Sequence, residues 1–298
     1  MQNLDFIITI LVTILLLVLT SIWFNRKTLF GDKDLKTPFY LILGPQSSGK
    51  TVLFEILKNN NEDIDIFKLP IDTVTSQEPN YLNDFKLPSD KDNKKNLGIF
   101  KLIDFPSNSK LKNLYLYPFL KSKINDKTLK NCRGIIYIID SSNFTNDYSN
   151  SIAKDLIELF KFTESLPGGI DICLFCNKSD LFTSKKSLKI KELLSIEIQK
   201  CWELNTKSLN KVKNGETTGS SISNSSGSSS GIRSPSDINN NSVDDDDEND
   251  FLNNVSSNGK FDFDLLDGNV DFIEGNMFKN KLQNVYNWID ERGVNFTM

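Results

Sequence analysis

The sequence contains no histidine among its 298 residues. This absence excludes catalytic triads and metal sites that depend on an imidazole, and it removes the usual general base near neutral pH. An excess of basic residues is also missing, because 35 Lys and Arg face 39 Asp and Glu. We therefore expect no direct sequence-specific contact with nucleic acid. Cysteines are too few for a disulfide scaffold in so long a chain, so we interpret all four as reduced thiols: Cys132, Cys173, Cys176 and Cys201.

Residues 6–24 contain no charged side chain and consist mainly of Ile, Leu, Val, Phe and Thr. A helix of that length spans about 28 Å, close to the hydrocarbon thickness of a bilayer, so we predict one transmembrane helix. Arg26 and Lys27 follow the run, which places residues 1–5 in the lumen and the rest in the cytosol. One alternative is a cleaved signal peptide, but the basic start and small-residue cleavage site are missing. The other is a buried apolar helix, which is usually shorter and has a polar face.

After a linker at residues 25–37, apolar runs of strand length alternate with amphipathic helical patterns. Runs without polar residues are typical of strands buried on both faces of a sheet, and the alternation indicates βαβ units. We therefore predict an α/β fold with a doubly wound, mostly parallel sheet and helices on both faces. The expected strands cover residues 39–43, 97–103, 134–140 and 170–176. The expected helices cover residues 51–58, 110–121, 148–165 and 185–204.

Ser, Asn, Gly and Asp dominate residues 206–260. This composition buries too little apolar surface to offset the entropy lost on ordering, so we predict a disordered insertion there. It divides the α/β domain into a first part, residues 38–205, and a last part, residues 261–298. The last part is expected to supply a short strand at 270–273 and a final helix at 277–292.

The pattern G-x-x-x-x-G-K-[ST] follows the first expected strand directly. Backbone N–H groups of such a loop and the N-terminus of the next helix cradle phosphates. Lys50 then reaches the β and γ phosphates, and the Thr51 hydroxyl binds Mg²⁺. Because strand, loop and helix come in the order this mechanism needs, we predict a nucleoside triphosphate with Mg²⁺. The expected binding residues of the loop are Gly44, Pro45, Gln46, Ser47, Ser48, Gly49, Lys50 and Thr51.

The sequence Asn177-Lys178-Ser179-Asp180 follows the strand expected at 170–176. Loops at the carboxyl edge of a parallel sheet are where a bound base is contacted. The Asp180 carboxylate can accept hydrogen bonds from the N1–H and the exocyclic amine of guanine, which adenine cannot offer. Asn177 is expected to brace the loop, and the aliphatic stem of Lys178 to cover the base plane. GTP is therefore the predicted nucleotide.

A third motif lies at the end of the strand expected at 97–103. Asp104 occupies the place of the D-x-x-G aspartate that holds Mg²⁺ near the γ-phosphate. Ser107 stands where that pattern has Gly, and Asn108 where a water-orienting Gln or His is usual. Thr75 is a candidate for a further hydroxyl ligand. We therefore predict Thr51, Thr75 and Asp104 as metal ligands. Ser107 and Asn108 occupy the region that positions the attacking water, but we assign neither of them as a catalytic residue.

These motifs, in this order, resemble the Ras-like GTPase superfamily. Three features narrow the resemblance to the β subunits of the signal recognition particle receptor: the N-terminal anchor, the Thr-x-Thr-Ser sequence at 73–76, and Asp104-x-Pro followed by Arg133-Gly134-Ile135. The resemblance implies a GTP-dependent heterodimer with the receptor α subunit at the endoplasmic reticulum membrane, and indirect links to the ribosome and translocon. The family's last recognition loop usually contains Ser-Ala. This chain has Glu274-Gly275-Asn276, so the backbone at Gly275 is expected to contact the base.

Three functional interpretations remain open at this stage. The chain is a membrane-anchored GTPase switch, an anchor in which GTP is a near-permanent cofactor, or a vesicle-traffic GTPase of the Arf or Sar type. The last type uses an amphipathic or acylated N-terminus rather than a spanning helix. GTP hydrolysis is expected to be slow because Gln46, Ser107 and Asn108 all depart from the residues of fast hydrolases.

Overall fold

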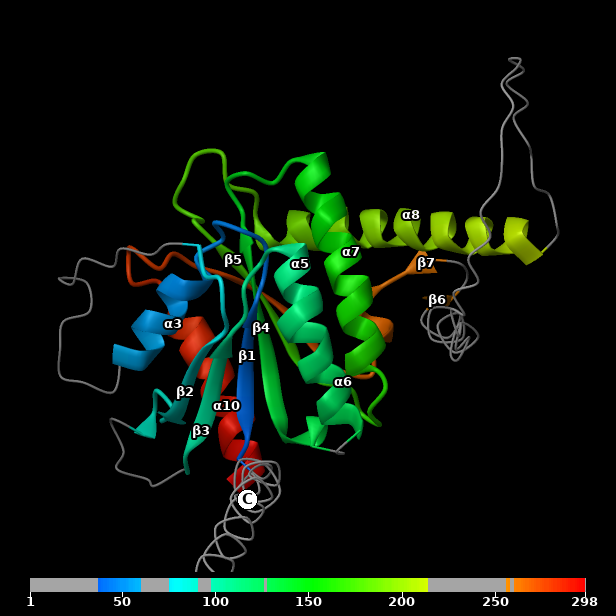
Figure 1. The fold of residues 1–298 in the computed structure, drawn as a ribbon. Helices are drawn as coiled ribbons and strands as arrows, with labels where there is room; N and C mark the ends of the chain where they lie inside the picture. The colour runs from blue at the N-terminus through cyan, green and yellow to red at the C-terminus, as the bar shows by residue number, and fades with distance from the viewer. Residues whose placement is uncertain are drawn as a thin grey trace, which may run out of the picture. The chain divides into compact units, whose positions relative to one another are not determined.

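In the part of the chain that the structure describes, a six-stranded sheet separates two layers of helices (Figure 1). The structure is a computed structural model, and it describes residues 37–59, 75–90, 98–125, 128–213, 256–257 and 260–297. The transmembrane helix predicted at 6–24 lies outside these ranges. Within them, no helix combines the length and the apolar character needed to cross a membrane.

The sheet has the strand order β2-β3-β1-β4-β5-β8. Strand β2 is antiparallel to β3, and the other neighbouring pairs are parallel, so the mostly parallel sheet is confirmed. The strands are β1 (Phe39–Leu43), β2 (Asn80–Phe85), β3 (Phe100–Asp104), β4 (Cys132–Asp140), β5 (Ile172–Asn177) and β8 (Val270–Glu274). A separate pair joins β6 (Ser256–Ser257) to β7 (Lys260–Phe261).

Helices cover both faces of the sheet, as the sequence predicts for a doubly wound fold. Buried residues of α3 (Lys50–Asn59) and of α10 (Gln283–Thr297) form one core with alternate residues of β1 and β4. The opposite face carries the second core. Its helices are α5 (Ser109–Leu111), η3 (Lys112–Leu116), α6 (Tyr117–Asn125), η4 (Leu129–Asn131), α7 (Asn146–Thr163), α8 (Ser187–Lys213) and η5 (Phe263–Leu265).

Two predicted boundaries are wrong by six residues or more. Helix α8 continues to Lys213, so residues 206–213 are helical although their composition predicted the start of the insertion. A helix that is already nucleated extends at little cost through polar residues such as Lys and Asn, which explains why α8 continues past its predicted end. The final helix begins at Gln283 rather than at residue 277. Residues 276–281 instead form a backbone bridge between Asn276 and Lys281.

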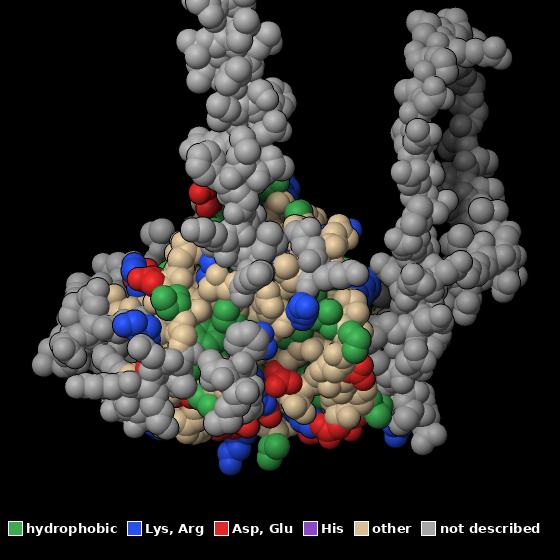
Figure 2. Space-filling view, turned by 90° about the horizontal axis from the view of Figure 1, so that it is seen from below, with side chains coloured by type: hydrophobic (Ala, Val, Ile, Leu, Met, Phe, Trp, Pro, Cys, Tyr) green, Lys and Arg blue, Asp and Glu red, His purple; other side chains and the backbone are tan. Residues whose placement is uncertain are grey.

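Charges of both signs are mixed on the surface. Figure 2, which views the molecule from below the orientation of Figure 1, shows Lys and Arg side chains interspersed with Asp and Glu on the described part of this face.

The seam between α10 and the sheet depends on one glycine. A Cβ atom added at Gly134 on β4 would lie 2.4 Å from the Trp288 ring of α10, closer than real atoms approach. Trp288 is held in place because its indole N–H donates to Asp271 Oδ2 at 2.9 Å. The tryptophan therefore occupies space that only a residue without a side chain leaves open.

We predict that Gly134→Ala lowers the free energy of unfolding of the full chain by about 1–3 kcal/mol, the usual cost of overpacking a core. Trp288→Phe removes the ring atoms nearest Gly134, so in that background the alanine substitution should cost less. Urea unfolding of the four proteins in detergent measures both costs. Equal costs in the two backgrounds would show that Trp288 is not the obstacle.

Candidate functional site

A polar cleft opens where β1 and β3 end. Its walls come from the loop between β1 and α3, from residues 75–76 and from the loop after β3, and its volume is about 110 Å³. The cleft brings together seven residues that the sequence predicts to act at one site: Gln46, Ser47, Gly49, Lys50, Thr51, Thr75 and Ser107. These segments are distant in sequence but converge because β1 and β3 are parallel neighbours.

The loop between β1 and α3 has a conformation that requires glycine. Gly44 has φ = 138°, and a Cβ there would lie 2.3 Å from the Ile138 carbonyl oxygen. Gly49 has φ = 107°, and its Cβ would meet the Asn177 side chain at 2.7 Å. The buried Ser48 closes the loop on itself by donating to the Pro45 carbonyl at 2.9 Å. The main chain is thereby curled around the N-terminus of α3, the geometry that binds phosphates.

Lys50 places a buried amine at the start of α3. Its Nζ donates to the Pro45 carbonyl oxygen at 2.8 Å. Burial lowers the pKa of Lys50 to about 8, and the nearby carboxylate of Asp104 offsets part of that shift. An anion in the cleft would stabilise the charged amine, so this lysine is suited to a phosphate group.

Asp104 is a buried carboxylate that lies behind Thr51, a residue of the cleft lining. Its Oδ2 accepts hydrogen bonds from Thr51 Oγ1 and Asn80 Nδ2, each at 3.0 Å. Its Oδ1 is buried and has no hydrogen-bond partner in the described residues. Burial raises the pKa of Asp104, against the opposing effects of the Asn80 hydrogen bond and the charge of Lys50. A buried carboxylate oxygen without a partner, beside a threonine hydroxyl, fits a hard cation such as Mg²⁺.

Ser76, rather than Thr75, contacts the predicted metal ligand Thr51, with 3.2 Å between the two hydroxyl oxygens. Thr75 Oγ1 instead accepts from Gln46 Nε2 at 3.5 Å, so Thr75 faces the phosphate loop. Sequence reasoning missed both Ser76 and Asn80. Ser76 belongs to the Thr-x-Thr-Ser sequence and could have been found there, whereas nothing in the sequence marks Asn80, which lies on the unpredicted strand β2.

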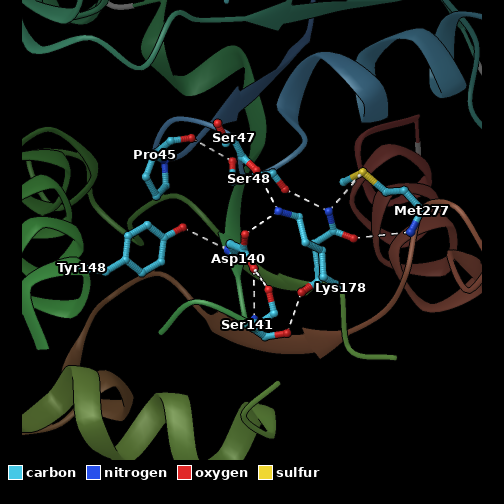
Figure 3. Close-up of polar contacts among 10 residues, drawn as sticks. Pro45, Ser47, Ser48, Asp140, Ser141, Tyr148, Lys178 and Met277 are labelled. Atoms are coloured by element: carbon cyan, nitrogen blue, oxygen red, sulfur yellow. Dashed lines mark hydrogen bonds and ion pairs between the residues drawn. The ribbon is translucent and has the colours of Figure 1, made fainter. Parts of the chain in front are cut away.

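Asn177 joins the phosphate loop to the loop after β8 through its contacts with Ser48 and Met277, which are labelled in Figure 3. Its Nδ2 donates to the Ser48 carbonyl at 2.9 Å, and its Oδ1 accepts from the Met277 backbone N–H at 3.4 Å. Its own carbonyl accepts from the Ser141 hydroxyl at 2.6 Å. Three loops therefore depend on this one buried side chain and its backbone for their relative positions.

Lys178 makes the second connection in the same region (Figure 3). It has φ = 62° and its Nζ donates to the Ser47 carbonyl at 3.1 Å and pairs with Asp140 Oδ2. Burial alone would raise the pKa of Asp140, but hydrogen bonds from Lys178 and Ser142 outweigh burial and hold it below its ordinary value. The sequence marked Asp140 only as the end of a strand, so this partner of Lys178 was missed.

Asp180 lies beyond Lys178, and both of its carboxylate oxygens are in contact with the loop after β8. Asn276 Nδ2 donates to Oδ1, and Lys279 Nζ lies 2.9 Å from Oδ2. The hydrogen bond from Lys279 is the main reason that the pKa of Asp180 is lowered. The Gly275 N–H, expected to contact a base, instead donates to the Cys176 carbonyl at 3.1 Å. That amide continues the β5–β8 pairing, which argues against the predicted contact.

Asn108 serves a structural purpose that the sequence did not indicate. It is the N-cap of α5, where its Oδ1 accepts from the Lys110 backbone N–H at 2.9 Å. Its side chain is thus already used at the position expected to orient water. Ser107 lines the cleft beside Pro106.

A family model and a related protein sequence identify the same family. Residues 35–270 match the family model of the signal recognition particle receptor beta subunit. The chain is 31% identical over 273 residues to the signal recognition particle receptor subunit beta of Saccharomyces cerevisiae, covering 90% of this chain and 89% of that protein.

Two solved structures have a similar fold. The mammalian SRP receptor aligns with a TM-score of 0.54 and 20% identity over 85% of this chain and 99% of that one. The SRb-GTP/SRX complex of the signal recognition particle receptor from Chaetomium thermophilum aligns with a TM-score of 0.50 and 18% identity over 86% and 98%. From its family model and its yeast relative, the chain belongs to the signal recognition particle receptor β subunit family.

Proposed function

We propose that the chain binds GTP with Mg²⁺ and, in that form, holds the receptor α subunit at the endoplasmic reticulum membrane for co-translational protein targeting. One observation carries the nucleotide assignment: Lys50 and Thr51 line one cleft, and Thr51 donates to the buried Asp104, whose Oδ1 has no hydrogen-bond partner among the described residues. Asp180 follows β5 at the same carboxyl edge of the sheet, where a base attached to those phosphates would lie.

Each part of the nucleotide has a proposed contact. The curled loop and Lys50 take the phosphates, while Thr51 and Asp104 hold Mg²⁺ with Thr75 or Ser76 as a further hydroxyl near the cation. Asn177 and Lys178 fix the loop that presents Asp180 to guanine. Mg²⁺ supplies charge neutralisation between the β and γ phosphates when it is bound.

Hydrolysis in this site is proposed to be slow. The Gln46 side chain projects into the cleft and reaches Thr75, so it takes up space near the expected γ-phosphate. Asn108 is used as a helix cap, and Ser107 replaces a glycine whose freedom such loops exploit. A long-lived GTP form suits a subunit that must hold a partner, whether as a switch or with GTP as a near-permanent cofactor.

Membrane attachment and partner binding complete the proposal. The apolar run at 6–24 anchors the chain, residues 1–5 face the lumen, and the linker at 25–37 leads to the cytosolic domain. The first part of the domain extends through α8 to Lys213, the insertion follows, and the last part supplies β8 and α10. The SRb-GTP/SRX complex of the signal recognition particle receptor from Chaetomium thermophilum, which has a similar fold, supports an α-subunit partner. Contacts with the ribosome and translocon are indirect in this proposal.

Asp180→Asn should change the nucleotide preference of the chain from guanine to xanthine. The amide keeps one acceptor and gains a donor, which suits the xanthine carbonyl in place of the guanine amine. We expect GTP affinity to fall at least tenfold and XTP affinity to rise above it, whereas ATP binds neither protein well. Equilibrium binding of the three nucleotides to the full chain in detergent measures this. Equal competition of ATP with GTP in the unmodified chain would refute the guanine assignment.

Single-turnover hydrolysis of GTP by the full chain with Mg²⁺ and no partner should proceed at about 10⁻⁴ s⁻¹, the slow Ras-like baseline. The reason is that neither Gln46 nor Asn108 is placed to orient an attacking water. A rate near 1 s⁻¹ would mean that another residue positions the water.

Lys50→Ala should abolish both GTP binding and capture of the α subunit, because the buried amine is the cation in the phosphate cleft. Lys58→Ala is the matched control, since Lys58 lies on the same helix but is exposed and pairs only with its neighbour Glu55 among the described residues. Pull-down of the α subunit from detergent-solubilised membranes with added GTP compares the two. Full capture of the α subunit by Lys50→Ala would show that partner binding does not require bound GTP.

A further inference from the structure

We propose that Lys279 is an affinity-determining residue of the base site, because its ammonium group competes with guanine for the carboxylate of Asp180. This inference rests on the proposed function, since it assumes that Asp180 accepts guanine. Lys279 lies outside the sequence motifs of the site. Its proposed effect is to lower nucleotide affinity, whereas a cation near a phosphate ligand would ordinarily raise it.

The backbone between β8 and α10 directs Lys279 toward Asp180. Asn276 and Lys281 exchange two backbone hydrogen bonds, of 3.3 and 2.9 Å, which close a short hairpin. Asn280 turns the chain with φ = 51°. The Lys279 backbone N–H donates to Asn276 Oδ1 at 2.9 Å, so the hairpin is tied internally as well. Lys279 therefore extends from a defined turn rather than from an open loop.

The two partners of Asp180 differ in how easily a base could replace them. Asn276 is 3% exposed and donates to Oδ1 from a side chain that the hairpin backbone also holds. The Lys279 side chain is 59% exposed, and its Nζ lies 2.9 Å from Oδ2. Removing the lysine from Oδ2 returns its charge to water at little cost, whereas moving the buried amide would leave it without a partner. Asn276 thus positions the carboxylate, and Lys279 is the replaceable contact.

Guanine needs both carboxylate oxygens, one for N1–H and one for the exocyclic amine. The ammonium of Lys279 offers the same kind of N–H donor to Oδ2 that guanine would. Each binding event therefore replaces the ion-paired hydrogen bond from Lys279 with a hydrogen bond from the uncharged base. Exposed ion pairs of this kind are weak, so the competition should lower nucleotide affinity by about two- to fivefold.

The sign of the effect makes the proposal testable. Removing a positive charge near a polyanionic ligand would ordinarily weaken binding. Competition predicts the reverse for Lys279→Met, namely a Kd for GDP and for GTP that is two- to fivefold lower. Lys281→Met is the matched control, because it removes the same charge from the same hairpin, and it should produce no gain. Isothermal titration of the full chain in detergent with GDP and with GTP, each with Mg²⁺, measures all three proteins.

A second background tests whether the effect acts through Asp180. In Asp180→Asn, titrated with xanthosine diphosphate, the ion pair no longer exists, so Lys279→Met should bring no gain. A gain that persists there, or unchanged or weaker GDP binding by Lys279→Met in the parent chain, would overturn the inference while leaving the guanine assignment intact. Failure of the parent chain to bind GTP at all would instead overturn the proposed function and this inference with it.

Discussion

The hydrogen bond from Asn177 to the Ser48 carbonyl is the contact on which the arrangement of the site depends. It links the end of β5 to the loop after β1, although the two strands are not neighbours and β4 lies between them. Lys178 reinforces the link through the Ser47 carbonyl and through Asp140 at the end of β4. The proposed phosphate and guanine contacts are therefore held by the same linked loops, so a change at either loop would alter the distance between them.

The buried groups of the cleft carry an electrostatic cost that the rest of the fold tolerates. Lys50 and Asp104 are both buried. Burial lowers the pKa of Lys50 and raises the pKa of Asp104, so it favours the neutral form of each side chain. Two well-packed helical layers around the sheet supply apolar burial on both faces. A stable apolar core around a destabilising cluster of buried charges is typical of functional sites, where the charges must be in place before the ligand binds.

The sequence predicted the features that local patterns encode. The apolar runs gave β1, β4, β5 and β8 within a few residues, and the glycine-rich and N-K-x-D motifs gave two loops of the site. Strand β2 was missed because Asn80–Phe85 is half polar and pairs along only one edge, with β3. The contacts of Asp180 with Asn276 and Lys279 could not be foreseen, because they join residues almost a hundred positions apart through a hairpin that looked helical.

The course of α8 bears on how the family can vary in length. This helix has 27 residues and so extends about 40 Å, about twice the length of the five- and six-residue strands of the sheet (Figure 1). The chain comes back to the same helix, where the Phe261 N–H donates to Gln199 Oε1 at 2.7 Å, and Phe261 and Phe263 then enter the core ahead of β8. Because both attachment points are on α8, sequence can be gained or lost between them without shifting the register of β8, which makes this stretch a natural place for lineage-specific growth.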